Sequence, residues 1–126
     1  MGTIYARVQL SNLLRDDLRP IEIDAMVDPG AINLCVPDIV RRELGLEIDR
    51  TRVAQMADGS LVEVGVIEPV TVQFDNRRTT TTAMVLGDEV LLGAIPMQDM
   101  DVMIDPRNER LIVPPDRPNF ALSKVK

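Results

Sequence analysis

The sequence contains no histidine, and this absence excludes several classes of enzyme at once. A Ser-His-Asp triad, a Cys-His pair and a His-ligated zinc or haem site all require the missing residue. The chain also lacks tryptophan and has only one tyrosine and two phenylalanines. The core must therefore be built from aliphatic side chains, and side-chain catalysis must rely on carboxylates, lysine, tyrosine or cysteine.

Cysteine and positive charge are scarce as well. The single cysteine, Cys35, cannot form an internal disulfide, and its apolar neighbours favour a buried, inert thiol over a reactive one. The 14 lysines and arginines are scattered and are outnumbered by 20 acidic residues, which gives a net charge of −6. Because no basic stripe is present, we do not expect a nucleic-acid partner.

Long hydrophobic runs are also missing. Residues 1–10 have neither the basic start nor the apolar segment of a signal peptide. No uncharged stretch approaches the roughly 20 residues that a membrane-spanning helix needs. We therefore expect a cytoplasmic protein without a membrane partner. A chain of 126 residues, 45% of them hydrophobic, suits one domain with one core.

Short segments with the pattern of β-strands make up most of the chain. Within them apolar residues either alternate with polar ones or run together, and turn residues separate one from the next. They are residues 3–10, 21–27, 31–36, 53–57, 61–66, 69–74, 79–86, 90–92, 102–104 and 111–113. Two hairpins are predicted among them: one across Asp58-Gly59, a dipeptide that favours a type I′ turn, and one across residues 75–78.

Two brief helices complete the prediction. Ile39, Val40 and Leu44 share one helical face, and Gly45 follows where a helix commonly ends. Residues 96–100 form the second helical segment, and this arrangement predicts a mostly β barrel or sandwich. Since the prolines after Val113 cannot continue a central strand, residues 1–113 are predicted as the domain and 114–126 as a C-terminal arm or tail.

Asp28 is the most informative residue for function. It lies on a tight turn between two strands whose other side chains belong to a core, where a carboxylate is costly unless it is bonded or used. Two interpretations are open at this point: the side chain caps its own Asp-Pro-Gly turn, or it performs chemistry.

Three landmarks resemble those of the retropepsin-like single-domain aspartic proteases, in the same order along the chain. They are Asp28-Pro29-Gly30-Ala31, the hairpin tip Ala57-Asp58-Gly59-Ser60, and Leu91-Leu92-Gly93 before a short helix. The resemblance covers approximately residues 3–114. It implies a small closed β-barrel with one or two short helices, and an active site that exists only in a homodimer.

The resemblance also implies a role for each of these residues. Asp28 of each subunit would be catalytic, residues 29–31 would form the active-site loop, residues 57–60 a flap over the substrate, and residues 91–93 the support beneath the loop. An ordinary surface turn would also explain residues 57–60, and a plain core strand that ends at glycine would also explain residues 91–93. In this family two carboxylates about 3 Å apart share one proton.

One carboxylate cannot serve as both general base and general acid at one carbonyl, so two copies related by a two-fold axis are expected to supply both roles. No metal or cofactor is required by such chemistry. The expected partner besides a second copy is a peptide or protein substrate in extended form, paired with the flap as an added strand. The pocket walls are expected to include Ile32, Val62 and Leu91.

Two positions depart from the family pattern. Pro29 replaces the usual Thr or Ser, whose hydroxyl and amide tie the two catalytic loops together, and each lost hydrogen bond is worth about 0.5–1.5 kcal/mol. A second hypothesis is therefore a catalytically weak or silent peptide-binding or dimerisation module on the same fold. Ala94-Ile95 follow Gly93 where retroviral relatives carry an arginine and an acid that brace the dimer.

A second Asp-Pro pair offers another arrangement of the site. Met103-Ile104-Asp105-Pro106 echoes Met26-Val27-Asp28-Pro29, which suggests either an intrachain pair of Asp28 with Asp105 or a type I turn at Asp105. A third reading of the whole chain is an aliphatic β domain in which Asp28 merely caps a turn. The tail after Pro114 either interleaves at a dimer interface or stays loose.

Overall fold

The computed structural model describes residues 2–125. In order along the chain, its strands and helices are β1 Tyr5–Asn12, β2 Ile21–Val27, β3 Leu34–Val36, α1 Asp38–Glu43, β4 Arg50–Gln55, β5 Leu61–Phe74, β6 Arg77–Val85, β7 Val90–Leu92, α2 Ala94–Met100, β8 Met103–Asp105 and β9 Arg110–Ile112. Within the described residues, neither helix has the length and apolar character needed to cross a membrane.

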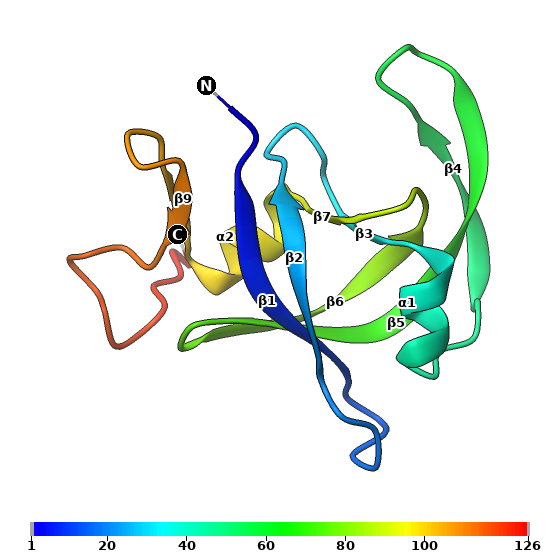
Figure 1. The fold of residues 1–126 in the computed structure, drawn as a ribbon, viewed down its shortest axis with the longest axis horizontal. Helices are drawn as coiled ribbons and strands as arrows, with labels where there is room; N and C mark the ends of the chain where they lie inside the picture. The colour runs from blue at the N-terminus through cyan, green and yellow to red at the C-terminus, as the bar shows by residue number, and fades with distance from the viewer. Residues whose placement is uncertain (1, 126) are drawn as a thin grey trace.

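Six of the strands close into a barrel. Their order is β1-β2-β7-β3-β6-β5, and β5 returns to pair with β1. β4 pairs with β5 alone and extends away from the barrel as one arm of a long hairpin, at the right of Figure 1. β8 and β9 form a separate two-stranded sheet. The predicted closed β-barrel with two short helices is confirmed.

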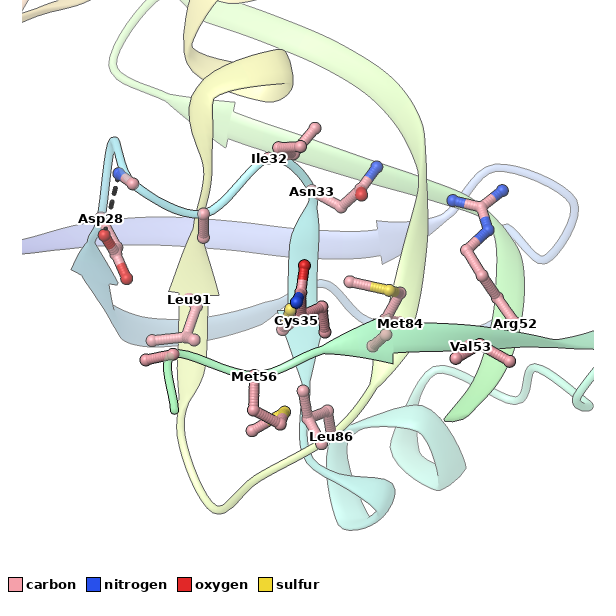
Figure 2. Close-up of a pocket in the computed structure, with 15 residues that line it drawn as sticks. Asp28, Ile32, Asn33, Cys35, Arg52, Val53, Met56, Met84, Leu86 and Leu91 are labelled. Carbon is pink, nitrogen blue, oxygen red and sulfur yellow. Dashed lines mark hydrogen bonds between the residues drawn. The ribbon is translucent and has the colours of Figure 1, made fainter. Parts of the chain in front are cut away.

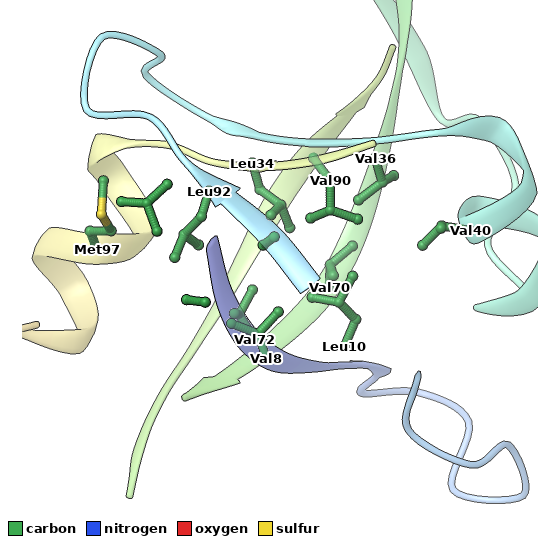
Figure 3. Close-up of a cluster of buried hydrophobic side chains, with 14 of the residues drawn as sticks. Val8, Leu10, Leu34, Val36, Val40, Val70, Val72, Val90, Leu92 and Met97 are labelled. Atoms are coloured by element: carbon green, nitrogen blue, oxygen red, sulfur yellow. The ribbon is translucent and has the colours of Figure 1, made fainter. Parts of the chain in front are cut away.

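The inside of the barrel is aliphatic, as the composition predicts. Alternate residues of β1 and β5, such as Val8, Leu10, Val70 and Val72, point inward and are almost completely buried (Figure 3). Leu34 and other residues of the short central strands meet them from the opposite side. Each fully buried side chain of this size stabilises the fold by about 1.5–3 kcal/mol.

The sequence misplaced one strand boundary in the middle of the chain. Residues 61–66 and 69–74 were expected as strands of two separate hairpins, but they form the single strand β5, which is 14 residues long. Pro69 has no N–H to donate to a neighbouring strand, so its position in the sequence predicts the end of a strand. The pairing of β5 with β6 instead shifts its register between Ile67 and Val70, which carries the strand past the proline.

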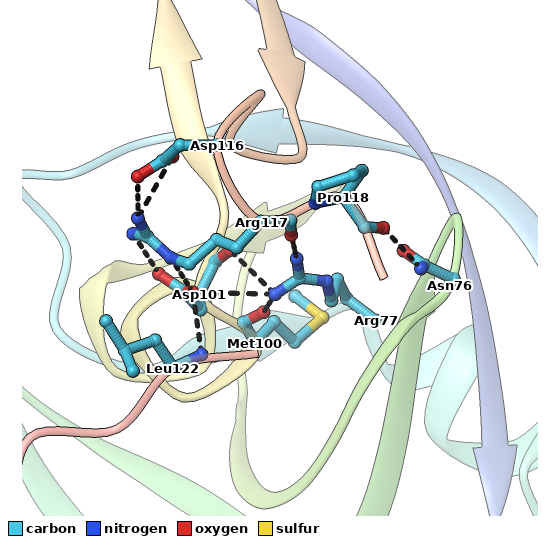
Figure 4. A network of polar contacts seen from close by, with 8 residues as sticks. All are labelled: Asn76, Arg77, Met100, Asp101, Asp116, Arg117, Pro118 and Leu122. Atoms are coloured by element: carbon cyan, nitrogen blue, oxygen red, sulfur yellow. Dashed lines mark hydrogen bonds and ion pairs between the residues drawn. The ribbon is translucent and has the colours of Figure 1, made fainter. Parts of the chain in front are cut away.

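The C-terminal segment is fastened to the end of α2. The Arg77 side chain, 2% exposed, donates hydrogen bonds to the carbonyl oxygens of Met100 and Asp101 (3.3 Å each) and of Arg117. Asp101 has a left-handed backbone (φ 54°), and its carboxylate accepts from Arg117 Nη2 at 2.8 Å and from the Leu122 N–H at 2.9 Å (Figure 4). The buried cation thus holds helix and tail together.

Asp101→Asn is expected to lower the melting temperature at neutral pH, because it leaves buried Arg77 without its counter-charge. The hydrogen bonds from Arg117 and then Leu122 hold the pKa of Asp101 well below its usual value of 3.8. A carboxyl with a depressed folded-state pKa stabilises the fold above its unfolded pKa and loses that contribution as the pH falls. The difference in melting temperature between parent and variant should therefore begin to shrink as the pH falls below about 4 and vanish only below the depressed folded-state pKa. A difference that is as large at about pH 2 as at about pH 7 would contradict this role.

Candidate active site

Asp28 lies immediately after β2, at the point where β2 and β7 run parallel. Val27 is paired with Leu92, and the Asp28 N–H donates to the Leu92 carbonyl at 3.0 Å. The alternating pattern of β2 buries Ala25 and Val27, and the chain then turns so that the Asp28 side chain is only partly exposed. The end of a core strand therefore fixes the backbone that carries this carboxylate.

The loop after Asp28 is closed by its own hydrogen bonds. The Gly30 N–H donates to Asp28 Oδ1 at 3.0 Å, and the Ala31 N–H donates to the Asp28 carbonyl at 3.1 Å. Pro29 is exposed at the outer side of the turn. Neither hydrogen bond uses an N–H at position 29, so the loop forms in spite of the proline.

Gly93 holds this loop against the start of α2. A Cβ at position 93 would overlap the Asn33 carbonyl oxygen and lie 2.8 Å from that of Ala31. The close approach lets the Ala94 and Ile95 N–H groups donate to the Ala31 and Ile32 carbonyls at 2.8 and 2.9 Å. Residues 31–33, expected as strand, are therefore loop, because the Ala31 and Ile32 carbonyls bond to α2 rather than to a neighbouring strand.

The hairpin of β4 and β5 projects over the same side of the barrel. The predicted type I′ turn is wrong, since Gly59 (φ 87°) has a positive φ and Asp58 does not. The Gly59 N–H donates to the Met56 carbonyl at 2.9 Å, which makes the tip a longer loop that ends in a left-handed glycine. Hydrogen bonds from Ser60, whose hydroxyl is 2.6 Å away, lower the pKa of Asp58.

An open groove of about 630 Å³ separates the hairpin from the Asp28 loop (Figure 2). Its lining comes from the Asp28 loop, β3, β4 and the flap tip, and the β6–β7 region: Asp28, Gly30, Ala31, Ile32, Asn33, Cys35, Arg52, Val53, Ala54, Gln55, Met56, Ala57, Met84, Leu86 and Leu91. The predicted active-site loop and the predicted flap thus face one cavity.

The structure brings only some of the predicted site residues into this groove. Asp28, Gly30, Ala31, Ala57 and Leu91 line it, as does Ile32. The remaining predicted residues, including one expected pocket wall, lie outside its lining: Pro29, Asp58, Gly59, Ser60, Val62, Leu92 and Gly93. Leu92 and Gly93 are buried beneath the loop, and the others at the hairpin are exposed.

Several lining residues were missed from the sequence. Met84 and Leu86 come from the end of β6 and the loop beyond it, and only the parallel pairing of β3 with β6 places them beside the Asp28 loop. Nothing in their local pattern indicates this. Cys35, opposite Leu91, is 3% exposed, and burial, followed by the nearby Asp28 charge, raises the pKa of its thiol. The predicted burial of Cys35 is confirmed.

Asp105 takes no part in the groove. It belongs to the β8–β9 hairpin, where its carboxylate accepts from Asn108 Nδ2 at 2.7 Å and lies 3.7 Å from Arg110 Nε. These bonds, with that of Asn108 first, lower the pKa of Asp105. The carboxylate stabilises its own turn, which favours the turn interpretation over an intrachain pair with Asp28.

The barrel, the aspartate loop packed on a short helix, and the projecting hairpin define the retropepsin-like fold. Solved structures with this fold include the retroviral protease-like domain of Ddi1 from Leishmania major, which is 15% identical over 91% of this chain and 90% of its own, with a TM-score of 0.63. The EIAV protease complexed with the inhibitor HBY-793 is 18% identical (82% and 93% covered, TM-score 0.62). A retropepsin-like aspartic protease from Rickettsia conorii is 21% identical (88% and 80% covered, TM-score 0.61).

At the level of sequence, no protein-family model and no curated protein matches the chain. The likeness to solved structures therefore establishes the fold, and any activity has to be argued from the site itself.

Proposed function

We propose that the chain is a homodimeric aspartic endopeptidase of the retropepsin type, which hydrolyses peptide bonds in extended segments. Asp28 of each subunit would supply one carboxylate of the catalytic pair. The observation that carries the proposal is the position of Asp28: it is the single carboxylate that lines a 630 Å³ groove, which a hairpin covers from the other side. Within residues 2–125 no cation bonds to it, and its side chain accepts only from Gly30.

Hydrolysis by such a pair requires one ionised and one protonated carboxyl group. The ionised carboxylate takes a proton from water as the water oxygen bonds to the carbonyl carbon, and the protonated carboxyl gives its proton to the carbonyl oxygen. Collapse of the resulting diol breaks the C–N bond as the nitrogen receives a proton, and the products are a carboxylic acid and an amine. One subunit holds only one of the two carboxyls, so the site is incomplete without a second copy.

Exposed apolar residues beside Asp28 support a partner subunit at this position. Ile32 is 65% exposed and Ile95 is 45% exposed, and the Ile95 N–H donates to the Ile32 carbonyl at 2.9 Å. The two side chains thus come from a loop and a helix that are held together next to the catalytic turn. With a two-fold axis through this region, Ile32 and Ile95 of each subunit would be covered by the other subunit, and the two Asp28 carboxylates would lie close together.

The first test is incubation of the purified protein with a complex peptide mixture between pH 4 and 7, with cleavage read by mass spectrometry and subunit state by sedimentation. The proposal expects internal cleavage and a dimer. A protein that stays monomeric at micromolar concentration and cuts nothing would instead support the third reading, a β domain in which Asp28 caps its turn.

A second candidate function is a peptide-binding or dimerisation module with little or no catalysis. It is favoured by Pro29, which has no N–H and no hydroxyl with which to tie the two catalytic loops across a dimer. The loop itself is intact without those donors, so a peptide could occupy the groove even if the carboxylates are poorly positioned for proton transfer.

Pro29→Thr separates the two functions. If the chain is an enzyme weakened by the proline, restoring the hydroxyl and the amide is expected to raise kcat/KM by about two- to tenfold for each hydrogen bond regained. Initial rates on the best peptide from the mixture would measure this, with peptide binding followed in parallel. Binding without cleavage in both the parent and the variant would establish the module instead.

A further inference from the structure

Few charged side chains line the groove. The chain carries 20 acidic and 14 basic residues, yet only two charged side chains line the groove, Asp28 and Arg52. The other lining residues are apolar, small or uncharged polar. A substrate lying in this groove would therefore meet one negative charge at the proposed catalytic centre and one positive charge elsewhere.

Arg52 stands apart from the other arginine on its strand. Arg50 Nη1 is bonded to Asp49 at 2.6 Å and to Glu68 at 3.1 Å, and those two carboxylates neutralise its charge. Within residues 2–125, Arg52 has neither an ion pair nor a hydrogen bond through its side chain, which is exposed. Its cross-strand partner on β5 is Val64, so no facing carboxylate neutralises it.

The two charges occupy opposite ends of the groove. In Figure 2 Asp28 lies at one end, Arg52 lies at the other, and Leu91, Met56 and Met84 fall between them. β4 is extended, so the four positions from Met56 to Arg52 span about 13 Å at ~3.3 Å per residue. An extended peptide that runs beside the hairpin advances at the same rate. Because Met56 itself lies between the two charges, this places Arg52 at least four residues from the bond over Asp28.

We propose that Arg52 is a specificity-determining residue that selects peptides with an acidic side chain several residues from the scissile bond, with apolar side chains between. This inference rests on the proposed peptidase function and names its substrate class. A guanidinium donates two parallel hydrogen bonds to a carboxylate, whereas a lysine or arginine of the peptide would be repelled. The intervening methionine and leucine side chains offer an apolar, adaptable surface for the central residues.

The test is a cleavage profile of a complex peptide mixture by three proteins: the parent, Arg52→Glu and Arg19→Glu. Arg19 is a matched control, since it is exposed, has no ion pair within the described residues and does not line the groove. The parent is expected to favour Glu and Asp over Gln and Asn at one fixed position by about two- to fivefold, the size of a partly exposed ion pair. Arg52→Glu should reverse this to a preference for Lys and Arg, and Arg19→Glu should leave it unchanged.

The other outcomes are distinguishable. Cleavage without acidic enrichment, or with the same enrichment in Arg52→Glu, would overturn the role of Arg52 and leave the peptidase function standing. An equal change in Arg19→Glu would show that overall charge, and not this position, sets the preference. A parent protein that cuts no peptide would overturn the proposed function, and the inference that rests on it would fall with it.

Discussion

Asp28→Asn is expected to abolish peptide cleavage, with a loss of about 1,000-fold or more, and to leave the fold and the dimer intact. Asparagine has nearly the shape of aspartate and keeps an oxygen that can accept the Gly30 N–H, so the loop should close as before. It can neither take a proton from water nor give one to the carbonyl oxygen. Because both subunits carry the same substitution, both catalytic roles disappear together.

Asp105→Asn is a matched control for this variant. Asp105 is likewise followed by a proline on a tight turn, but its carboxylate bonds to Asn108 within its own hairpin. The control should lower stability slightly and leave kcat/KM unchanged. Cleavage by Asp28→Asn at the parental rate, or loss of cleavage in Asp105→Asn alone, would show that the carboxylates have been assigned wrongly.

Mixing the two proteins tests whether the site is shared between subunits. If each dimer needs two aspartates, a ninefold excess of Asp28→Asn over the parent should reduce the parental activity roughly tenfold, because random exchange leaves few parent pairs. If one subunit held a complete site, the added variant would leave the rate of the parent unchanged. Thermal melting and sedimentation of the variant alone show whether it folds and pairs.

Gly93→Ala is expected to lower both the stability of the fold and the rate of peptide cleavage. The added Cβ would overlap the Asn33 carbonyl oxygen and crowd that of Ala31, and both obstacles are backbone atoms that cannot rotate away. Overpacking of this kind costs about 1–3 kcal/mol, or roughly 5 to 15 °C in melting temperature. The loop that moves is the one that carries Asp28, so cleavage should fall by more than the stability loss explains.

Gly87→Ala provides the comparison. A Cβ at Gly87 would meet nothing within 4 Å, although its backbone is left-handed (φ 78°) and the substitution therefore costs about 1–2 kcal/mol of strain. The two variants should lose comparable stability, but only Gly93→Ala should lose activity at a temperature where both are folded. Equal activity of the two would mean that the contact at Gly93 does not position the loop.

Local pattern was enough to predict most strands of this fold and its central loop. Alternation marked β2, the Asp-Gly pair marked the hairpin over the groove, and the resemblance of Asp28, the hairpin tip and Gly93 to an ordered set of landmarks indicated the barrel. The predictions that were confirmed depend on residues that lie close together in the sequence, or on a resemblance to a family whose fold already implies the contacts between distant residues. Pro69 misled because a register shift accommodates a residue that normally ends a strand.

The remainder depends on contacts between residues far apart in the chain. Arg77 gives no local sign that it is buried, and only its bonds to Met100, Asp101 and Arg117 explain it. Arg52 likewise becomes informative only when the closed barrel places β4 across from Asp28. Charged residues of this kind look alike in a sequence, because their partners, or the lack of them, are set by the tertiary structure.

The attachment of β4 gives the groove two walls of unequal stiffness. One wall is built from short strands bonded on both sides and from a loop clamped on α2, whereas β4 is paired along one edge only and is almost entirely exposed. Bending this hairpin breaks few contacts, whereas deforming the opposite wall would disturb the core. Under the proposed function, peptides with side chains of different sizes are therefore expected to be accommodated by bending of the hairpin, while the Asp28 carboxylate keeps its position.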